Sequence, residues 1–187
     1  MKVFEVALCL FATLRGVSLA VNSRTIDNAW QLSNEIGQFQ KASEVITHKG
    51  VYYLVFGTKN LPYDCVASTV TAMYDSDKAA SYKRIYITSS QKTEVTGSAS
   101  VASDIRGQGT VIYMSIMGYE RRVKYQVVFA ERNKCHILHN PETGAYQLWV
   151  NQDEVKYLPR GCDFVYWLVT YRLETHIIYN EEKCKLV

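Results

Sequence analysis

The chain has 187 residues, which is long enough for one domain with a sizeable hydrophobic core. Its 21 Lys and Arg residues nearly balance its 18 Asp and Glu residues, and the formal net charge is +3 at pH 7. A charge this small does not predict binding to nucleic acid or to a membrane surface.

The N-terminus shows the pattern of a secretory signal peptide. Lys2 gives a positive start, an apolar run covers residues 6–14, and Ser18-Leu19-Ala20 is a small-x-small cleavage site. Glu5 and Arg15 interrupt the pattern, so a buried N-terminal helix is the alternative. The apolar run is too short to cross a bilayer, which takes roughly 20 apolar residues.

Cleavage would leave a secreted domain of residues 21–187 with a net charge of +2 and four cysteines. An even number of cysteines in an oxidising compartment predicts disulfides, and four allow three pairings. The spacing favours a local bridge between Cys135 and Cys162 and a long bridge from Cys65 to Cys184. A zinc site is the alternative, but no CxxC pair supports it, and we expect no metal.

The first predicted element of this domain is an amphipathic helix over residues 28–44, in which Trp30, Leu32, Ile36 and Phe39 recur at helical spacing. Strands follow, rich in β-branched and aromatic residues and separated by short turns. They are expected at residues 51–56, 65–73, 82–88, 93–101, 111–117, 123–130, 135–139 and 146–150.

Eight strands with short connections predict an all-β antiparallel sandwich or up-and-down barrel. After Pro159-Arg160-Gly161 the spacing of Phe164, Trp167, Leu168 and Tyr171 becomes helical again. This predicts a helix that packs on the outside of the sheet. Residues 179–187 form a tail that the long bridge would hold.

The chain carries no recognisable catalytic motif. It lacks the nucleophile elbow, the P-loop, the His-Glu-x-x-His pattern and a dinucleotide-binding Gly motif. His136 and His139 would point to opposite faces of one strand, so they cannot readily share a ligand. We therefore expect a protein that is not an enzyme and has no cofactor.

Tyrosine is abundant, with 14 residues against six phenylalanines. A closed eight-stranded barrel leaves room for side chains or one small ligand, and inward tyrosines would give a cavity apolar walls with a few hydroxyls. More than half of the strand tyrosines are nevertheless expected on the outer surface. The candidate ligand-binding residues are Trp30, Tyr53, Tyr82, Tyr86, Tyr113, Tyr125, His136, Gln147 and Trp149.

Five segments together resemble the tick histamine-binding-protein family, the salivary lipocalins of blood-feeding ticks. They are Asp27-Asn28-Ala29-Trp30, Val51-Tyr52-Tyr53-Leu54-Val55, Met117-Gly118-Tyr119, the stretch from Cys135 through Leu148-Trp149 to Cys162, and Asn180-Glu181-Glu182-Lys183-Cys184. The resemblance implies an eight-stranded barrel, an N-terminal helix near one barrel end, a C-terminal helix outside, and the two bridges. It also implies secretion into the host and capture of small inflammatory mediators, chiefly histamine and serotonin, and in some members leukotrienes or other lipids.

The chain departs from the amine-binding members of that family. They carry an acid directly after the cysteine and another just before the Leu-Trp pair, where this chain has His136 and Gln147. A third cavity acid falls on Leu61. A buried ammonium needs a carboxylate partner, because an unpaired charge in a low-dielectric cavity is very unfavourable. The remaining acids near the barrel are Asp64, Glu94 and Asp104.

Three hypotheses for the function follow. A biogenic amine could be held by residual acids and by aromatic faces, as the family frequency favours. An eicosanoid or other apolar ligand fits the side-chain chemistry better, with its carboxylate met by Arg84, Lys124 or His136. The third is a scaffold whose surface binds a host protein. We expect a secreted monomer in each case.

Overall fold

The structure, a computed structural model, describes residues 37–76, 78–105 and 107–187. The expected signal peptide, Trp30 and the first part of the expected N-terminal helix lie outside these residues. The predicted all-β barrel is confirmed. Its strands are β1 (Val51–Gly57), β2 (Cys65–Tyr74), β3 (Ala79–Ile87), β4 (Lys92–Ala102), β5 (Val111–Ile116), β6 (Arg122–Glu131), β7 (Cys135–Asn140) and β8 (Ala145–Asn151).

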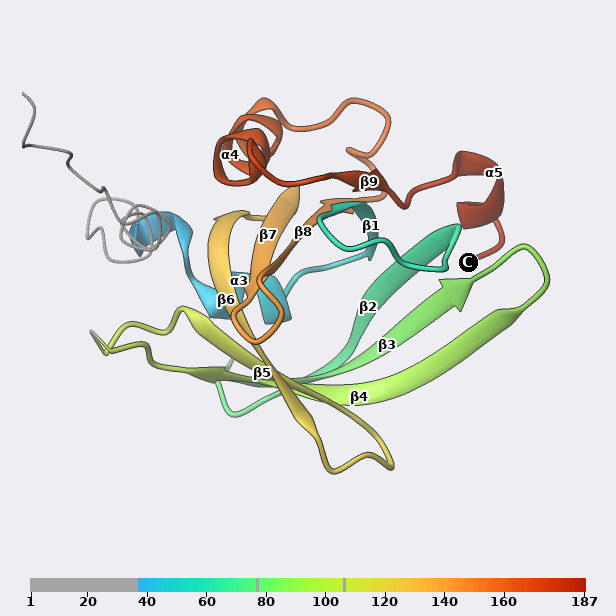
Figure 1. The fold of residues 1–187 in the computed structure, drawn as a ribbon. Coiled ribbons are helices and arrows are strands. Elements are labelled where there is room, and N and C mark those ends of the chain that lie inside the picture. The colour runs from blue at the N-terminus through green and yellow to red at the C-terminus, as the bar shows by residue number, and fades with distance from the viewer. Residues whose placement is uncertain (1–36, 77, 106) are drawn as a thin grey trace, which may run out of the picture. The chain divides into compact units, whose positions relative to one another are not determined.

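Each strand pairs antiparallel with the next, and β1 closes the barrel by pairing with both β8 and β2 (Figure 1). Closure at the β1–β2 seam is short, with Tyr52 opposite Ser68. On the other side of β1, Leu54 lies opposite Trp149. Closure places these residues on a common inner wall, because side chains alternate between the two faces of each strand.

One glycine allows a tyrosine to cross the barrel interior. Gly97 on β4 lies directly under the Tyr82 ring, and a Cβ at this position would clash with that ring and with the Ser115 carbonyl. The Tyr82 hydroxyl donates a hydrogen bond to the Ser115 carbonyl at 3.1 Å. The missing side chain therefore makes the space that Tyr82 fills.

A short segment closes one end of the barrel. The 3-10 turn η2 (Gly37–Phe39) and helix α3 (Ala42–Ile46) lie there, and Val45 and Ile46 pack into the core. The expected short N-terminal helix is present as α3, but its predicted bounds of 28–44 are wrong in their described part, since Gln40 and Lys41 separate the turn from the helix. The Gln40 side chain donates to the Val128 carbonyl, which ties this segment to β6.

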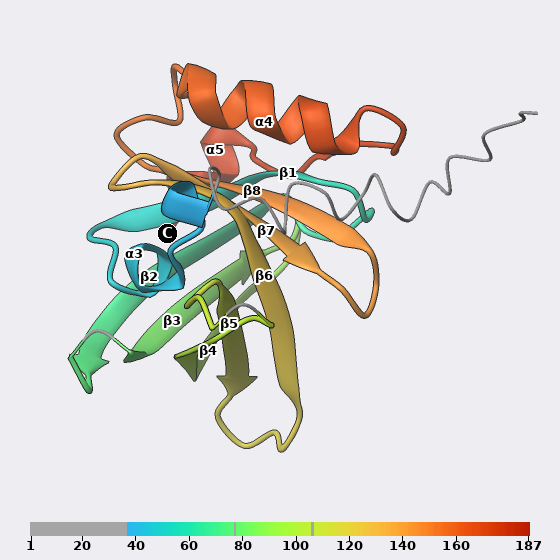
Figure 2. The same cartoon turned by 90° about the vertical axis from the view of Figure 1, so that its left-hand side faces the viewer.

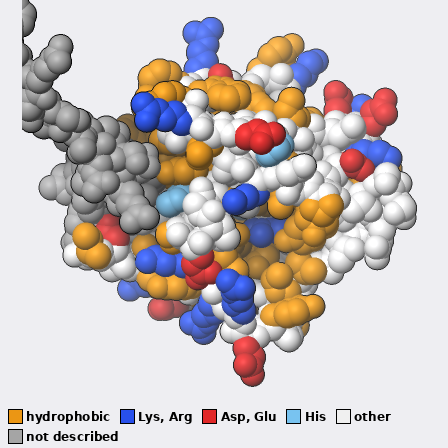
Figure 3. Space-filling view, viewed as in Figure 1, with side chains coloured by type: hydrophobic (Ala, Val, Ile, Leu, Met, Phe, Trp, Pro, Cys, Tyr) orange, Lys and Arg blue, Asp and Glu red, His pale blue; other side chains and the backbone are white. Residues whose placement is uncertain are grey.

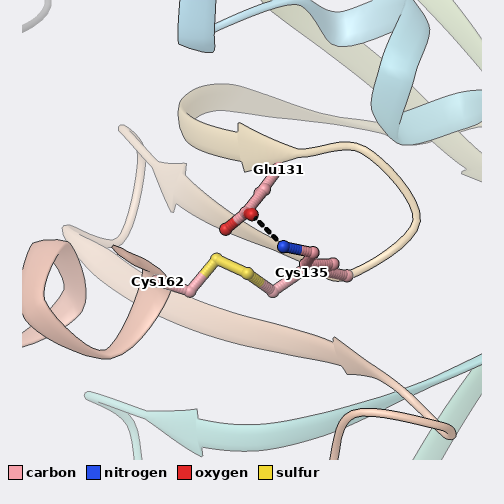
Figure 4. The surroundings of a disulfide bond; sticks show 4 residues. Glu131, Cys135 and Cys162 are labelled. Atoms are coloured by element: carbon pink, nitrogen blue, oxygen red, sulfur yellow. Dashed lines mark hydrogen bonds and ion pairs between the residues drawn. A yellow bond between two sulfur atoms is a disulfide. The ribbon is translucent and has the colours of Figure 1, made fainter. Parts of the chain in front are cut away.

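Helix α4 (Arg160–Thr170) lies outside the barrel against β6, β7 and β8, as predicted (Figure 2). A disulfide joins Cys162 of α4 to Cys135 of β7, next to the ion pair of Glu131 and Lys134 (Figure 4). Among the described residues, no helix is long and apolar enough to cross a membrane.

The C-terminal tail covers part of the outer wall. Strand β9 (His176–Ile177) pairs with the end of β1, and helix α5 (Glu181–Cys184) carries the second disulfide, from Cys184 to Cys65. The residues beneath the tail form a second apolar cluster that includes Ile85 and Ile87. The outer side of β2 and β3 is therefore buried around Cys65, Ala67, Ile85 and Ile87, so the side chains that alternate with these face the cavity.

Candidate ligand-binding site

The barrel interior contains a cavity in two compartments. The outer compartment has a volume of about 420 Å³ and opens among the loops that join β1 to β2 and β5 to β6. The inner compartment, of about 30 Å³, lies deeper, towards α3. Arg84 and Trp149 line both, so they form the boundary between them. Figure 3 shows a hollow on this face of the molecule, bordered by hydrophobic side chains.

Arg84 of β3 lines this cavity and is half-buried. Its Cζ lies 4.9 Å from the Trp149 ring centroid and 5.2 Å from that of Tyr82. Its Nη2 donates to the Met114 sulfur at 3.6 Å, a weak acceptor, and its Nε has no hydrogen-bond partner. The guanidinium is therefore held by aromatic rings, by the Met114 thioether and by a hydrogen bond with the Tyr86 side chain.

The charge of Arg84 is permanent, because guanidinium groups keep their proton in proteins. Burial opposes the charged form, but the hydroxyls of Tyr86, Tyr125 and Tyr82 outweigh it and raise the pKa of Arg84. None of the described residues that line either compartment is acidic. The cavity therefore holds one positive charge without a carboxylate.

The three positions at which the family resemblance implies acids all line the cavity. Leu61 and Gln147 face the outer compartment, and His136 faces the inner one. Gln147 accepts a hydrogen bond from the Trp149 indole at 3.1 Å. His136 lies opposite Trp149 in the β7–β8 register. The substitutions therefore remove negative charge from the cavity itself.

The other acids considered from the sequence do not line the cavity. The exposed carboxylate of Glu94 pairs with Lys92, 3.8 Å away. The Asp104 carboxylate accepts from the Gln108 amide and the Thr110 hydroxyl within the β4–β5 loop. Asp64 is absent from the walls of both compartments.

Two buried histidines lie behind Arg84. Their rings stack at 5.8 Å, and the Tyr52 ring lies 4.0 Å from that of His48 and 5.1 Å from that of His136. Burial lowers the pKa of His48 to about 4. Burial, then the neighbouring His48 and the charge of Arg84, hold the pKa of His136 well below its usual value. Both histidines are therefore neutral at pH 7.

The structure brings together six of the nine sequence-predicted site residues. They are Tyr82, Tyr86, Tyr125, His136, Gln147 and Trp149. Two predictions need correction, because Tyr53 packs against Tyr179 on the outer wall and Tyr113 lies in a separate outer groove. Lys124 lies in that same groove and cannot meet a ligand inside the barrel. Trp30 lies outside the described residues.

The sequence interpretation missed several cavity residues. His48 lies in the segment after α3, where no periodic pattern exists to indicate its direction. Tyr63 and Tyr119 come from loops at the open end. For Met114 the alternation of β5 was a usable signal, since Ile112 and Met114 share the inner face.

A closed antiparallel barrel with one open end, a helix on its outer wall and an internal cavity defines a lipocalin-type protein that binds small ligands. The sequence profile of the family described as tick histamine binding protein matches residues 30–186. The chain belongs to this family.

Solved structures show the same fold. A crystal structure of AM182 in complex with serotonin is 20% identical, with a TM-score of 0.60, over 76% of this chain and 92% of that one. Insecticyanin from the tobacco hornworm Manduca sexta is 14% identical, with a TM-score of 0.53, over 73% of this chain and 80% of that one. A search of curated proteins finds no match.

Proposed function

We propose that this barrel is a secreted, extracellular protein that binds an acidic amphipathic small molecule, such as a fatty-acid-derived inflammatory mediator of the host. The acid group binds Arg84, and the apolar chain fills the outer compartment. The observation that carries this proposal is the guanidinium of Arg84, which lies in a cavity whose described walls contain no carboxylate.

Charge separates the two main ligand classes. Unit charges 5 Å apart interact by about 3 kcal/mol at an effective dielectric constant of about 20. An ammonium would therefore meet repulsion from Arg84, and nothing acidic along the described walls compensates it. A carboxylate would gain a comparable attraction and could accept two hydrogen bonds from the planar guanidinium.

The outer compartment suits an apolar chain. Its volume of about 420 Å³ falls within the range of small-molecule sites, and Leu54, Leu61, Val66 and Ile116 contribute apolar wall. Tyr63 and Tyr86 contact each other near its opening, with tilted rings whose centroids are 4.8 Å apart. Arg84 lies at the inner end of the compartment, so an acidic ligand would enter with its head group first.

A biogenic amine is the second candidate, supported by the family match and by the serotonin complex of AM182. The aromatic walls could receive an ammonium through cation–π contacts. However, Arg84 already lies over the face of Trp149. We therefore favour the acidic ligand for this chain.

Three probes with the same tail test the proposal. Dodecanoate, dodecanol and dodecylamine differ only in their head groups, and calorimetric titration ranks their affinities. We expect dodecanoate to bind most tightly, and Arg84→Met to weaken it about 10- to 100-fold, as the loss of a charged hydrogen bond implies. Lys124→Met on the outer wall is the matched control.

Tighter binding of dodecylamine, or of serotonin and histamine in parallel titrations, would overturn the acidic-ligand proposal in favour of an amine. Absence of binding for every probe would favour the hypothesis that the barrel is a scaffold for a host protein.

A further inference from the structure

The inner compartment gathers basic groups without an acid. Arg84 and His136 line the same space of about 30 Å³, together with His48. Trp149 lies next to both Arg84 and His136, with its ring centroid 6.2 Å from that of His136 and 4.9 Å from the guanidinium Cζ of Arg84. An acid group held by Arg84 at this boundary would therefore lie at the entrance to the compartment that His136 lines.

The groups that face His136 come from several elements, and none of them favours the protonated form of its ring. His48 follows α3, and Tyr52 lies on β1. Tyr82 and Arg84 belong to β3. The other wall residues of this compartment cannot titrate; they are Val45, Ile46, Ser68, Val70, Ala80, Ala99, Ile112, Met114, Leu138 and Trp149.

Glu154 is an acid that acts on this group of rings, and it lies beyond β8 and outside the cavity walls. Its influence is on Tyr52, where it adds to the effect of burial and raises the pKa of the hydroxyl. His136 therefore has no anionic neighbour in the free protein along the described walls of its compartment.

A ligand carboxylate on Arg84 reverses this situation. It would neutralise the positive neighbour of His136 and supply a negative one, and an opposite charge within about 4–6 Å favours the protonated ring. We propose that His136 is the second residue that binds the acid group, and that it takes up one proton from solvent when the ligand enters. The resulting imidazolium donates a hydrogen bond to the carboxylate, so Arg84 and His136 hold the acid from two strands.

This inference rests on the proposed function and adds a pH dependence of ligand affinity to it. Because the complex binds one more proton than the free protein, affinity for an acid rises as pH falls, by up to about tenfold per pH unit. The rise is confined to the interval between the pKa of His136 in the free protein and its pKa in the complex. Neutral dodecanol should show no such rise through this route.

Proton uptake is measured by calorimetric titration of dodecanoate at about pH 6.5, the ordinary pKa of histidine, in buffers with different ionisation enthalpies. The slope of the observed enthalpy against the buffer enthalpy gives the number of protons bound. We expect net uptake approaching one proton. His136→Asn should abolish it, and His139→Asn, on the outer face of the same strand, should leave it unchanged.

NMR of the wild-type protein gives a second measure that does not depend on any variant folding. The imidazole signals of His136 should move to the protonated position when dodecanoate is added. Binding without proton uptake, or with the signals of His136 unchanged, overturns this inference and leaves the proposed function standing. Absence of dodecanoate binding overturns both.

Discussion

Arg84 of β3 lays its guanidinium over the indole of Trp149 on β8, with 4.9 Å between Cζ and the ring centroid. Gln147 accepts the indole N–H and so helps to fix the ring. This contact separates the two compartments and gives the charge of Arg84 an aromatic partner, which is worth about 1–2 kcal/mol when desolvated. Such a contact leaves the charge free to attract an anion.

Replacing Arg84 should weaken ligand binding without lowering the stability of the fold. Arg84→Met removes a buried charge that has no described carboxylate partner, so the free energy of unfolding should stay equal or increase. Urea unfolding measures this change, with Lys83→Met on the opposite face of β3 as the control. A fall in the free energy of unfolding by more than about 2 kcal/mol would show that Arg84 stabilises the fold, contrary to this expectation.

Restoring the missing acids should convert the cavity to amine binding. An Asp introduced at position 136 alone would pair with Arg84 instead of with an amine. The variant that tests amine binding therefore combines His136→Asp and Gln147→Glu with Arg84→Met. We expect this triple variant to bind serotonin or histamine at least about tenfold more tightly than the wild type, because a charge-assisted hydrogen bond is worth roughly 1.5–3 kcal/mol.

The control for this conversion is His139→Asp with Arg84→Met, which places the acid on the outer face of β7. Equal amine affinity in the two variants would mean that positions 136 and 147 do not face the bound ligand.

The two buried histidines should make stability depend on pH. Their pKa values are lowered in the folded protein, to about 4 for His48, whereas the unfolded chain has the usual value near 6.5. Below about pH 6.5 the unfolded state binds more protons, so stability is complete above this pH and decreases as pH falls.

Each histidine should contribute a slope of up to about 1.4 kcal/mol per pH unit. Urea unfolding between about pH 7 and pH 5 measures the slope. His136→Asn should flatten it, while His139→Asn should keep it. A midpoint that does not change over this interval would contradict the burial of these two neutral rings.

The sequence predicts all eight barrel strands to within a few residues, because each is a short β-branched and aromatic run ended by turn residues. The chemistry of Tyr82, Tyr86 and Arg84 of β3 correctly identifies them as cavity candidates, but the alternation of β3 does not predict which of its faces lines the cavity. Ile85 and Ile87 alternate with Arg84 and Tyr86, and alternation alone places the isoleucines inside. The structure does the opposite, because the C-terminal tail buries the outer wall and gives the isoleucines a second apolar cluster.

The same effect explains the error at Tyr53. Both faces of β1 are covered, one by the barrel interior and one by the tail, so Tyr52 and Tyr53 are equally suited to either side. A strand buried on both faces loses the period-two signal that tells inside from outside. The predicted bounds of the N-terminal helix are wrong for another reason. In the described part, tertiary contacts such as the Gln40–Val128 hydrogen bond replace a regular helix.

The two disulfides should differ in their effect on stability. Cys65 and Cys184 are separated by 119 residues, and Cys135 and Cys162 by 27. In the chain-entropy treatment the longer loop gives the larger stabilisation, about 5 kcal/mol against about 3.5 kcal/mol. Paired Cys→Ala replacements and urea unfolding compare them, and mass spectrometry without reductant should show no free thiol among these four cysteines. An equal loss for both pairs would contradict the loop-length argument.

A crystal structure of the protein with dodecanoate would show where the acid group binds. The carboxylate should lie within hydrogen-bond distance of the Arg84 guanidinium at the inner end of the outer compartment, with the chain directed towards Tyr119 at the opening. A carboxylate at the opening with the chain against Arg84, or an amine in the cavity at comparable occupancy, would contradict an acid-binding barrel.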